Sequence, residues 1–496
     1  MNQKTSSTHS YYDADIVVVG AGGAGLTAAA AGAEKGARVI IIDKRKPGGS
    51  SAMAKGFLAA ESPFQKRAMI HTPKDLVYKI AMEYGHLKMD PRIVRAFVNK
   101  SGDTAGWLEK MGITVGHVSP SYIDQEPLTW HIVDGGGDRV ITQLKRYCAE
   151  LGVQILPRTE AKNISHHKGR ITGVTVIKGG LESVIRTNSV ILATGGYGGN
   201  KELLKKYCSI YHDGMPCIGV PNMGDGVVMA TSLGAATEGL GVLQLAGPFY
   251  PERTPIMING KEIIMPLAAI GFEPNIVWVN KKGERFIDET VGGDHFESAY
   301  AVVRQPDMVA FIIADSGIIQ TMEAQGLIAG QGKYKEIQRR GMPGLPQAIR
   351  SVVHNGRTLV SESWDEIASW MGAEPQTLKN TIEEYNACCD QGYDPIFAKE
   401  RQFLIPLRTP PYYAMKGDIR FLGTIGGIKI NHHMEVIDLQ GYPIPGLFAA
   451  GVDTGGWTGD NYCGKLPGTT FGFALNSGRI AGENAAIFVL KGASKA

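Results

Sequence analysis

The hydrophobic pattern of the first 45 residues predicts a strand, a glycine-rich turn, a helix and a second strand. Ile16, Val17, Val18 and Val19 form a β-branched run that leads into the turn. An alanine-rich stretch continues to position 33, and a second apolar run over 37–42 ends in an acid. Short apolar runs bounded by glycines are typical of buried strands, so the pattern predicts a β-α-β unit.

The turn of this unit contains Gly20-x-Gly22-x-x-Gly25, and the second strand ends at Asp43. In such a unit Gly20 permits a tight turn, Gly22 lets the backbone approach a pyrophosphate, and Gly25 lets the helix pack close to the strand. The free N–H groups at the helix N-terminus attract phosphates. Asp43 follows at about the distance expected for an acid that binds ribose hydroxyls. The pattern therefore predicts a dinucleotide site, and the alternative is an ordinary strand–helix turn.

Further along the chain, the periodicity predicts more helices and strands. Helical spacing of apolar residues recurs over 73–113, after 134 and over 361–389, where Ser363 is the expected N-cap. Strands are expected over 153–156, 171–177 and 187–192, with a polar turn between the last two. The last strand runs into a second glycine turn at Gly195-Gly196. The loop over 44–56 consists largely of small residues and could line a phosphate or a flavin edge, or be a plain surface loop.

Length and charge narrow the class of protein. A chain of 496 residues exceeds one typical core, so two or three domains are expected. The net charge of +3 gives no broad electrostatic reason to expect nucleic acid or a membrane surface as partner. No run of about 18 apolar residues is present, so we expect no membrane span.

The cysteines and the N-terminus predict a cytoplasmic protein. The six cysteines show neither CxxC nor Cys/His metal spacing, which favours reduced thiols and no metal site. Residues 1–13 are polar and lack the apolar segment of a secretory signal.

Three later motifs add to the N-terminal unit: Ala193-Thr194-Gly195-Gly196, Gly224-Asp225-Gly226, and Pro445 through Gly451. Their order resembles the flavoprotein superfamily of fumarate reductases and succinate dehydrogenases, which includes the 3-ketosteroid dehydrogenases, over roughly residues 14–488. The resemblance implies FAD and an α/β fold with a Rossmann-like FAD-binding domain that is discontinuous, over 1–240 and 355–496. An α+β capping domain over 241–354 would be inserted between the two parts.

The resemblance also implies which residues hold FAD. The cofactor site would comprise Gly20, Gly22, Gly23, Ala24, Gly25, Asp43, Lys44, Gly49, Ser50, Ser51, Gly56, Ala161, Thr194, Gly195, Asp225, Gly451, Asp453, Gly468, Thr469, Thr470 and Phe471. Membrane-bound relatives attach FAD covalently to a histidine. Because Ser50 stands there, we expect noncovalent FAD. Relatives often carry Glu directly after the glycine matching Gly451. Here Val452 and then Asp453 follow, and whether Asp453 substitutes is left open.

The catalytic pattern of fumarate reductases is only partly present. The motif around Arg285-Phe286 matches, and Arg285 is expected to form a structural ion pair, but Gly293 stands where the family places its proton-donating arginine. Substrate-clamping histidines are missing from 244–248 and from the position before Thr424. The family's last substrate-clamping motif ends in an arginine. That arginine aligns with Tyr462 when residues are counted from the N-terminal side of the motif, and with Lys465 when they are counted back from Gly478-Arg479.

A dicarboxylate needs charged partners to offset its lost hydration, so fumarate is not the expected substrate. The late loop, around Asn461-Tyr462-Cys463-Gly464 and with Trp457, Phe471 and Phe473 nearby in the sequence, resembles the 3-ketosteroid dehydrogenase-like branch more than true fumarate reductases. It favours a hydrophobic cyclic ketone or enone, steroid-like or polyphenol-like. The candidate catalytic residues are Tyr462, Lys465, His295 and Tyr300, and for each the alternative is a packing role beside the flavin or on the cap.

We therefore expect an FAD-dependent oxidoreductase that moves a hydride across a C–C bond next to a carbonyl, as an ene-reductase or a dehydrogenase. One alternative is a fumarate- or urocanate-type carboxylate reductase. Another is a non-catalytic flavin-binding redox subunit. The expected partners are a small-molecule substrate and an unidentified electron donor or acceptor. The sequence shows no haem or iron–sulfur motif and no second nucleotide fingerprint for NAD(P)H.

Overall fold

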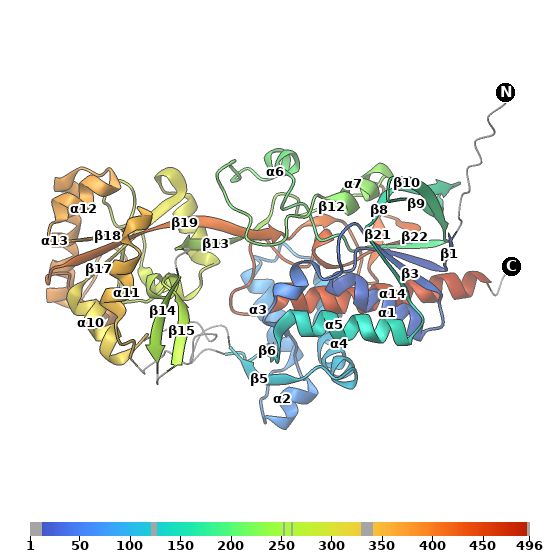
Figure 1. Cartoon of the computed structure of the whole chain (residues 1–496), viewed down its shortest axis with the longest axis horizontal. Coiled ribbons are helices and arrows are strands. Elements are labelled where there is room, and N and C mark those ends of the chain that lie inside the picture. Colours follow the sequence, from blue (N-terminus) through green and yellow to red (C-terminus); the bar gives the residue numbers. More distant parts are fainter. Residues whose placement is uncertain (1–11, 121–125, 251–252, 259–260, 329–340, 494–496) are drawn as a thin grey trace.

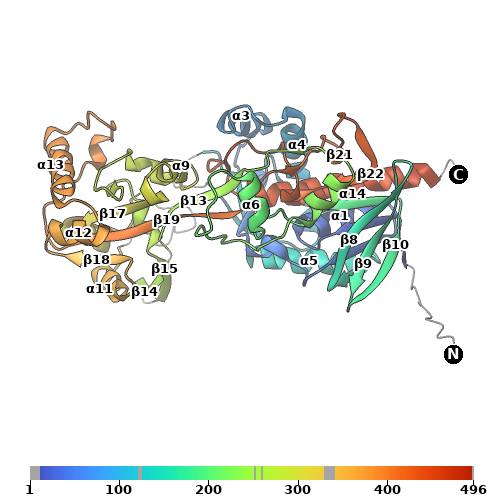
Figure 2. The same ribbon diagram turned by 90° about the horizontal axis from the view of Figure 1, so that it is seen from above.

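The computed structural model of the chain describes residues 12–120, 126–250, 253–258, 261–328 and 341–493. They form an elongated molecule with a large body, at the right of Figure 1, and a small body at the left. The same two bodies are seen from above in Figure 2. The hydrophobic core of the large body is built mainly from residues 14–246 and 419–486. The core of the small body is built from residues 250–415.

The centre of the large body is a six-stranded sheet in the order β21-β22-β11-β2-β3-β7. All strands but the edge strand β21 run parallel. The strands are β2 (Ile16–Val19), β3 (Val39–Asp43), β7 (Gln154–Pro157), β11 (Ser189–Leu192), β21 (Glu435–Ile437) and β22 (Pro443–Ala449). Every residue of β2 is buried, which explains its unbroken apolar sequence.

Two helices pack against each other beside this sheet: α1 (Gly23–Glu34) and α14 (Thr469–Ala493). Their backbones approach closely because α14 carries glycines at the contact. A Cβ at Gly478 would lie 2.2 Å from the Ala24 carbonyl oxygen, and one at Gly482 would lie 2.0 Å from that of Ala28. Figure 1 shows α14 running behind α1 to the C-terminus.

The predicted helices are confirmed as α3 (Lys74–Tyr84), α4 (Pro91–Lys110), α5 (Gly136–Glu150), α12 (Trp364–Met371) and α13 (Pro375–Gln391). The Ser363 hydroxyl accepts a hydrogen bond from Asp365 N, as expected of an N-cap. The expected polar turn before β11 contains a strand. It belongs to a four-stranded sheet formed by β1 (Tyr12–Asp13), β8 (Thr159–His167), β9 (Arg170–Lys178) and β10 (Leu181–Arg186). Most of β10 is exposed or half-buried, so its sequence lacks a clear apolar signal.

The small body contains the sheet of β13 (Leu243–Phe249), β16 (Val277–Val279), β17 (Val309–Asp315), β18 (Thr358–Ser361) and β19 (Tyr412–Thr424), and the hairpin β14 (Arg253–Ile258) and β15 (Lys261–Pro266). Helices α10 (Ser316–Gln325), α11 (Leu345–Ser351), α12 and α13 surround it. The 13-residue strand β19 runs from this body into the large one (Figure 1). Because the core of the small body extends past residue 354, we propose that the inserted unit ends near residue 415.

The remaining elements are short: β4 (Gly56–Leu58), α2 (Pro63–Arg67), β5 (Val115–Ser119), β6 (Trp130–Val133), α6 (Lys201–Tyr207), α7 (Asp225–Ser232), β12 (Thr237–Glu238), α8 (Ala268–Gly271), α9 (Glu297–Val303), β20 (Gly427–Ile428) and short 3-10 turns that include Glu289–Gly293 and Gly451–Asp453. Among the described residues, none of the helices is long and apolar enough to cross a bilayer. The same residues contain no cluster of side chains suited to hold a metal ion.

Candidate active site

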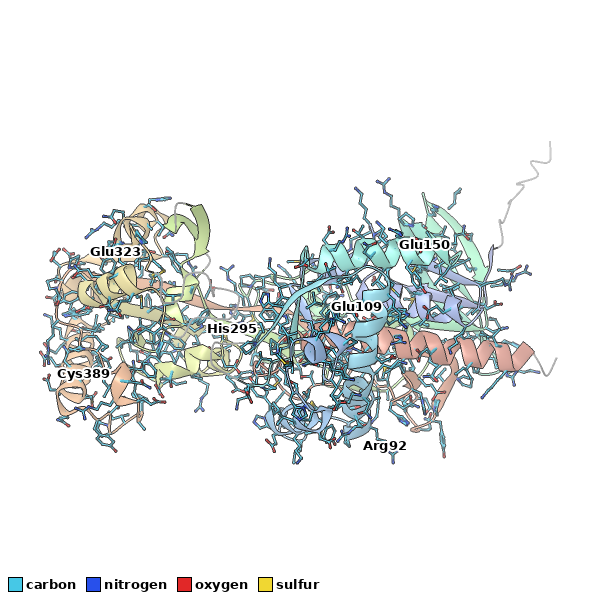
Figure 3. The ribbon with its side chains drawn as sticks, turned by 90° about the horizontal axis from the view of Figure 1, so that it is seen from below. Arg92, Glu109, Glu150, His295, Glu323 and Cys389 are labelled. Atoms are coloured by element: carbon cyan, nitrogen blue, oxygen red, sulfur yellow. The ribbon has the colours of Figure 1, made fainter. Side chains whose placement is uncertain are left out.

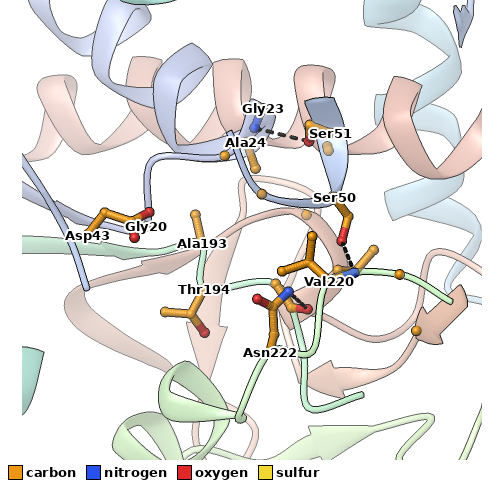
Figure 4. Close-up of a pocket in the computed structure, with 18 of the residues that line it drawn as sticks. Gly20, Gly23, Ala24, Asp43, Ser50, Ser51, Ala193, Thr194, Val220 and Asn222 are labelled. Carbon is orange, nitrogen blue, oxygen red and sulfur yellow. Dashed lines mark hydrogen bonds between the residues drawn. The ribbon is translucent and has the colours of Figure 1, made fainter. Parts of the chain in front are cut away.

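A cavity of about 630 Å³ opens at the carboxyl ends of the parallel strands in the large body. The chain leaves β2 at Gly20, β3 after Asp43, β11 at Ala193 and β22 at Ala450, and all four positions line it. In open parallel sheets this edge is where ligands bind. The cavity extends from Ala161, in β8, to the points where β13 and β19 leave for the small body. Figure 4 shows its central part.

The first glycine turn has the geometry that the sequence motif predicts. Gly20 has a φ of +107°, and a Cβ on it would lie 2.3 Å from the Ala193 carbonyl oxygen. A Cβ at Gly25 would lie 1.8 Å from the Gly20 carbonyl oxygen, so Gly25 allows α1 to start close to β2. A Cβ at Gly22 would have only one protein atom within 4 Å, the Gly48 carbonyl oxygen at 3.8 Å. The turn therefore leaves room for a ligand above the N-terminus of α1.

Polar contacts connect the loop after β3 to the walls of the cavity. The Asp43 carboxylate accepts hydrogen bonds from Ala21 N at 2.7 Å and from Arg45 N at 2.7 Å. Lys44 forms an ion pair with Asp225, at the start of α7.

The Arg45 guanidinium donates to Asn222 Oδ1 at 2.5 Å. The amide of Asn222 in turn donates to the Gly195 carbonyl at 2.7 Å (Figure 4). Both cations and carboxylates therefore line the end of the cavity near the expected nucleotide ribose and phosphates, among them Arg45 and Asp43.

The structure brings most of the predicted cofactor residues to this cavity: Gly20, Gly22, Gly23, Ala24, Asp43, Lys44, Gly49, Ser50, Ser51, Ala161, Thr194, Gly195, Asp225, Gly451, Thr470 and Phe471. Five lie outside its lining, namely Gly25, Gly56, Asp453, Gly468 and Thr469. At Gly56 and Gly468 a Cβ would come within 2.1 Å and 2.8 Å of neighbouring backbone atoms, so these glycines allow close packing.

These features fit FAD. The open turn at the start of α1 suits a pyrophosphate, and Asp43 stands where a ribose is expected. The cavity continues past Gly451 and Thr470 to an uncharged end that suits a flavin ring. FAD bound here would supply hydride chemistry, and the surrounding residues would hold and orient it.

Several residues that line the uncharged end were not predicted. Gln244, which is 6% exposed, accepts a hydrogen bond from the Thr470 hydroxyl at 3.3 Å through Oε1. Leu422 and Gly423 line the same end. The sequence did carry a signal for these three residues, because they stand in the two segments from which the family's clamp histidines are missing. Asn222 had no such signal.

The four candidate catalytic residues lie outside the cavity lining. Tyr462 is 6% exposed, its hydroxyl accepts a hydrogen bond from Thr469 N at 3.2 Å, and its ring lies 4.4 Å from that of Phe296. Burial raises the pKa of Tyr462 well above its usual value. Lys465 is exposed.

The other two candidates belong to the segment around α9. The Tyr300 hydroxyl donates to the Asp460 carbonyl, and burial raises the pKa of Tyr300. The His295 ring lies 4.0 Å from that of Phe296 and 5.6 Å from that of Phe272. Figure 3 places His295 on the side of the small body that faces the large one. The late loop and α9 thus meet at the junction of the two bodies.

Asp294 strengthens this junction. Its Oδ2 accepts from the Tyr84 hydroxyl at 2.9 Å, and its Oδ1 accepts from Phe296 N at 3.1 Å. A Cβ at Gly464 would lie 2.2 Å from both carboxylate oxygens, so the late loop needs glycine at this contact. Burial raises the pKa of Asp294. Tyr84 was not predicted, because nothing in its helical pattern separates it from a packing residue.

The fold and the cavity define a flavin-dependent member of the α/β class. Residues 15–464 match the family model described as FAD binding domain, so the chain belongs to that family. Vinyl phenol reductase of Lactiplantibacillus plantarum is 34% identical over 97% of this chain and 98% of that protein. A probable fumarate reductase, Ifc3, of Shewanella frigidimarina is 31% identical over 95% of this chain and 74% of that protein.

Among solved structures, 3-ketosteroid-Δ4-(5α)-dehydrogenase of Rhodococcus jostii matches with a TM-score of 0.74 at 22% identity, over 97% of this chain and 98% of that one. The predicted fold class, the superfamily and the use of FAD are confirmed, and the protein is an FAD-dependent oxidoreductase acting on CH–CH groups. The narrower placement beside the 3-ketosteroid dehydrogenases stays a prediction, because a likeness at 22% identity shows the shared fold alone.

Proposed function

We propose that this protein reduces a carbon–carbon double bond in a small, neutral, cyclic and largely apolar substrate, with noncovalently bound FAD. The uncharged end of the cavity carries the proposal. It is lined by Gln244, Leu422, Gly423, Thr424, Val452, Thr470 and Phe471, none of which bears a charge. A carboxylate placed there would lose its hydration without an ionic partner. A phenol or a carbonyl needs only one hydrogen bond, and the amide of Gln244 is suited to supply it.

The likeness to vinyl phenol reductase supports a polyphenol-like substrate over a steroid-like one. The predicted ketone or enone differs from a vinyl phenol in where its oxygen stands. A cyclic enone and a vinyl phenol are both neutral and conjugated, and each offers an oxygen that can take part in a hydrogen bond.

FAD, when bound, supplies the hydride for such a reduction. The second carbon of the double bond needs a proton, and we propose Tyr462 as its donor: it lies outside the cavity lining, but its oxygen is hydrogen-bonded to Thr469 N, next to the lining residue Thr470. Because Thr469 N donates to the Tyr462 oxygen, the phenolic proton stays free to be given away. The group is protonated at neutral pH, as an ordinary tyrosine is, and burial raises its pKa further. Lys465 is the alternative donor, but its side chain is exposed.

Noncovalent attachment of FAD is proposed from Ser50, which lines the cavity where covalent relatives carry histidine. The Ser50 hydroxyl accepts a hydrogen bond from Val220 N at 3.3 Å and therefore contributes to the wall of the site. Acid precipitation of the purified protein should release all of the flavin into the supernatant. Flavin that stays with the precipitated protein would contradict this assignment.

The competing function is a fumarate- or urocanate-type carboxylate reductase, which the likeness to a probable fumarate reductase supports. Anaerobic turnover with a chemically reduced viologen dye separates the two. We expect a hydroxystyrene to be reduced and fumarate and urocanate to be turned over at least about 100-fold more slowly, the scale of one lost ionic contact. Comparable turnover of fumarate would contradict the proposal.

A further inference from the structure

We propose that Asp453 is a positioning residue that holds the FAD cavity in its binding shape by tying the second glycine turn and the start of α7 to the end of β22. The proposal goes beyond the function given above, because it concerns cofactor retention and not the substrate. Asp453 itself does not line the cavity. It acts through residues that do.

The carboxylate of Asp453 is fully buried, with 0% of the residue exposed, and it faces hydrogen-bond donors of the second glycine turn. One oxygen accepts from Thr194 N. The other accepts from the Thr194 hydroxyl at 3.0 Å and from Gly196 N at 2.7 Å. Gly195 and Gly196, with φ values of +92° and +77°, give this turn a backbone that other residues rarely adopt. The bonds to Asp453 therefore hold the turn on both sides of Gly195.

The contact continues through Thr194 to α7. The Thr194 hydroxyl donates to Asp453 and accepts from Gly226 N at 3.0 Å. A Cβ at Gly226 would lie 2.8 Å from both Asp453 Oδ2 and Thr194 Oγ1, so only glycine allows the three to meet. The neighbouring Asp225 is paired with Lys44 in the loop after β3.

One carboxylate thus connects three walls of the cavity. Gly451 and Val452, which directly precede it, line the flavin end. Thr194 and Gly195 line the middle, and Asp225 lines the wall beside Lys44. Relatives often carry an acid directly after the glycine that matches Gly451. In this chain the acid is one residue later, and its carboxylate accepts hydrogen bonds from Thr194 and Gly196 without lining the cavity.

The test measures FAD affinity in Asp453→Asn, with apoprotein refilled by added FAD and binding followed by quenching of flavin fluorescence. Asparagine has nearly the size of aspartate, but its side-chain amide directs an N–H group toward the donors of Thr194 and Gly196. We expect the Kd for FAD to rise about tenfold or more, as for loss of a hydrogen bond to a charged group.

The matched control is Asp315→Asn in the small body. Asp315 is 2% exposed and accepts from Ile318 N, Arg408 N and Thr409 N, each at 2.9 Å. This control should lower the unfolding temperature at least as much as Asp453→Asn and leave the Kd for FAD unchanged. An Asp453→Asn protein that binds FAD within about twofold of wild type would overturn the proposal. An equal rise of the Kd in both variants would overturn it too, because that would show a general stability effect.

A second pair of variants decides the question if Asp453→Asn fails to fold. Thr194→Val removes the hydroxyl that joins Asp453 to Gly226, and Thr194→Ser keeps it. We expect weaker FAD binding in the first and near-normal binding in the second. Equal affinity in these two variants would contradict the role of the contact. None of these measurements involves substrate, so they succeed or fail independently of the proposed reduction.

Discussion

At the residue scale, Tyr462 is the side chain on which the proposed proton transfer depends. It is buried, its ring packs on Phe296, and its oxygen accepts a backbone hydrogen bond. The nearby Tyr300 has a similar environment, but its hydroxyl already donates to the Asp460 carbonyl. This difference in hydrogen bonding gives the two tyrosines different expected roles.

We predict that Tyr462→Phe lowers kcat for double-bond reduction by about 100-fold or more, the usual contribution of a positioned general acid. Substrate affinity and FAD content should change little. Tyr300→Phe is the matched control and should keep kcat within a few-fold of wild type. The measurement is steady-state turnover with a reduced dye. Equal activity of the two variants would remove Tyr462 from the mechanism.

If Asp453 holds the cavity as proposed, its charge should make FAD binding depend on pH. Burial raises the pKa of Asp453 to about 6, and the negative charge of Asp225, which is itself paired with Lys44, acts in the same direction. Above this pH the ionised group accepts all of its hydrogen bonds, and below it the acquired proton faces only donors. We predict that the Kd for FAD rises about tenfold from pH 7 to pH 5 in wild type. In Asp453→Asn the Kd should stay nearly constant.

The pKa of Asp453 affects the stability of the fold in the opposite direction to FAD binding. Loss of FAD at low pH can therefore be distinguished from unfolding. The pKa of Asp453 is higher in the folded protein than the 3.8 of an ordinary Asp. This group alone therefore stabilises the fold at low pH, and that contribution is lost as the pH rises through about 6. Loss of FAD at pH 5 with an unchanged circular dichroism spectrum would agree with the account. A Kd for wild type that does not vary between pH 5 and 7 would contradict it.

At the scale of elements, the β2-α1-β3 unit was predictable because each requirement is local. The apolar runs, Gly20 and Asp43 lie within 30 residues: the runs form β2 and β3, Gly20 makes the tight turn, and Asp43 ends β3 at the cavity. The ion pair expected of Arg285 is also present, to Glu289 at 2.8 Å and to Asp394 at 2.9 Å.

The strand β10 was missed because its exposed sequence carries no alternation. The Asn222 and Tyr84 contacts were missed for another reason. Asn222 reaches Arg45, and Tyr84 reaches Asp294, across 177 and 210 residues of sequence. Periodicity within one element carries no information on such partners.

The close contact of α1 and α14 leads to a stability prediction. A Cβ at Gly482 would lie 2.0 Å from the Ala28 carbonyl oxygen. Gly482→Ala should therefore lower the free energy of unfolding by about 1–3 kcal/mol, because the helices must move apart. Gly293→Ala is the control, since a Cβ there meets nothing within 4 Å. Urea denaturation measures both, and equal stabilities would contradict the packing described here.

At the scale of the whole molecule, the cavity and the candidate proton donors belong to different regions. The cavity lies within the large body, whereas Tyr462, His295 and Tyr300 gather where α9 meets the late loop. Among the described strands, only β13 and β19 run from the sheet of the small body to the cavity in the large body (Figure 1). We propose that the inserted unit ends near residue 415 and not at residue 354, because α12 and α13 pack in the core of the small body.

On the function proposed above, reduced flavin in this protein passes its hydride to a neutral, conjugated cyclic substrate. The most direct measurement is anaerobic stopped-flow mixing of the photoreduced holoenzyme with a hydroxystyrene, and separately with fumarate, while the flavin absorbance is followed. We expect rapid return of the oxidised flavin spectrum with the hydroxystyrene and little change with fumarate on the same timescale. Rapid reoxidation by fumarate, with none by the hydroxystyrene, would contradict it.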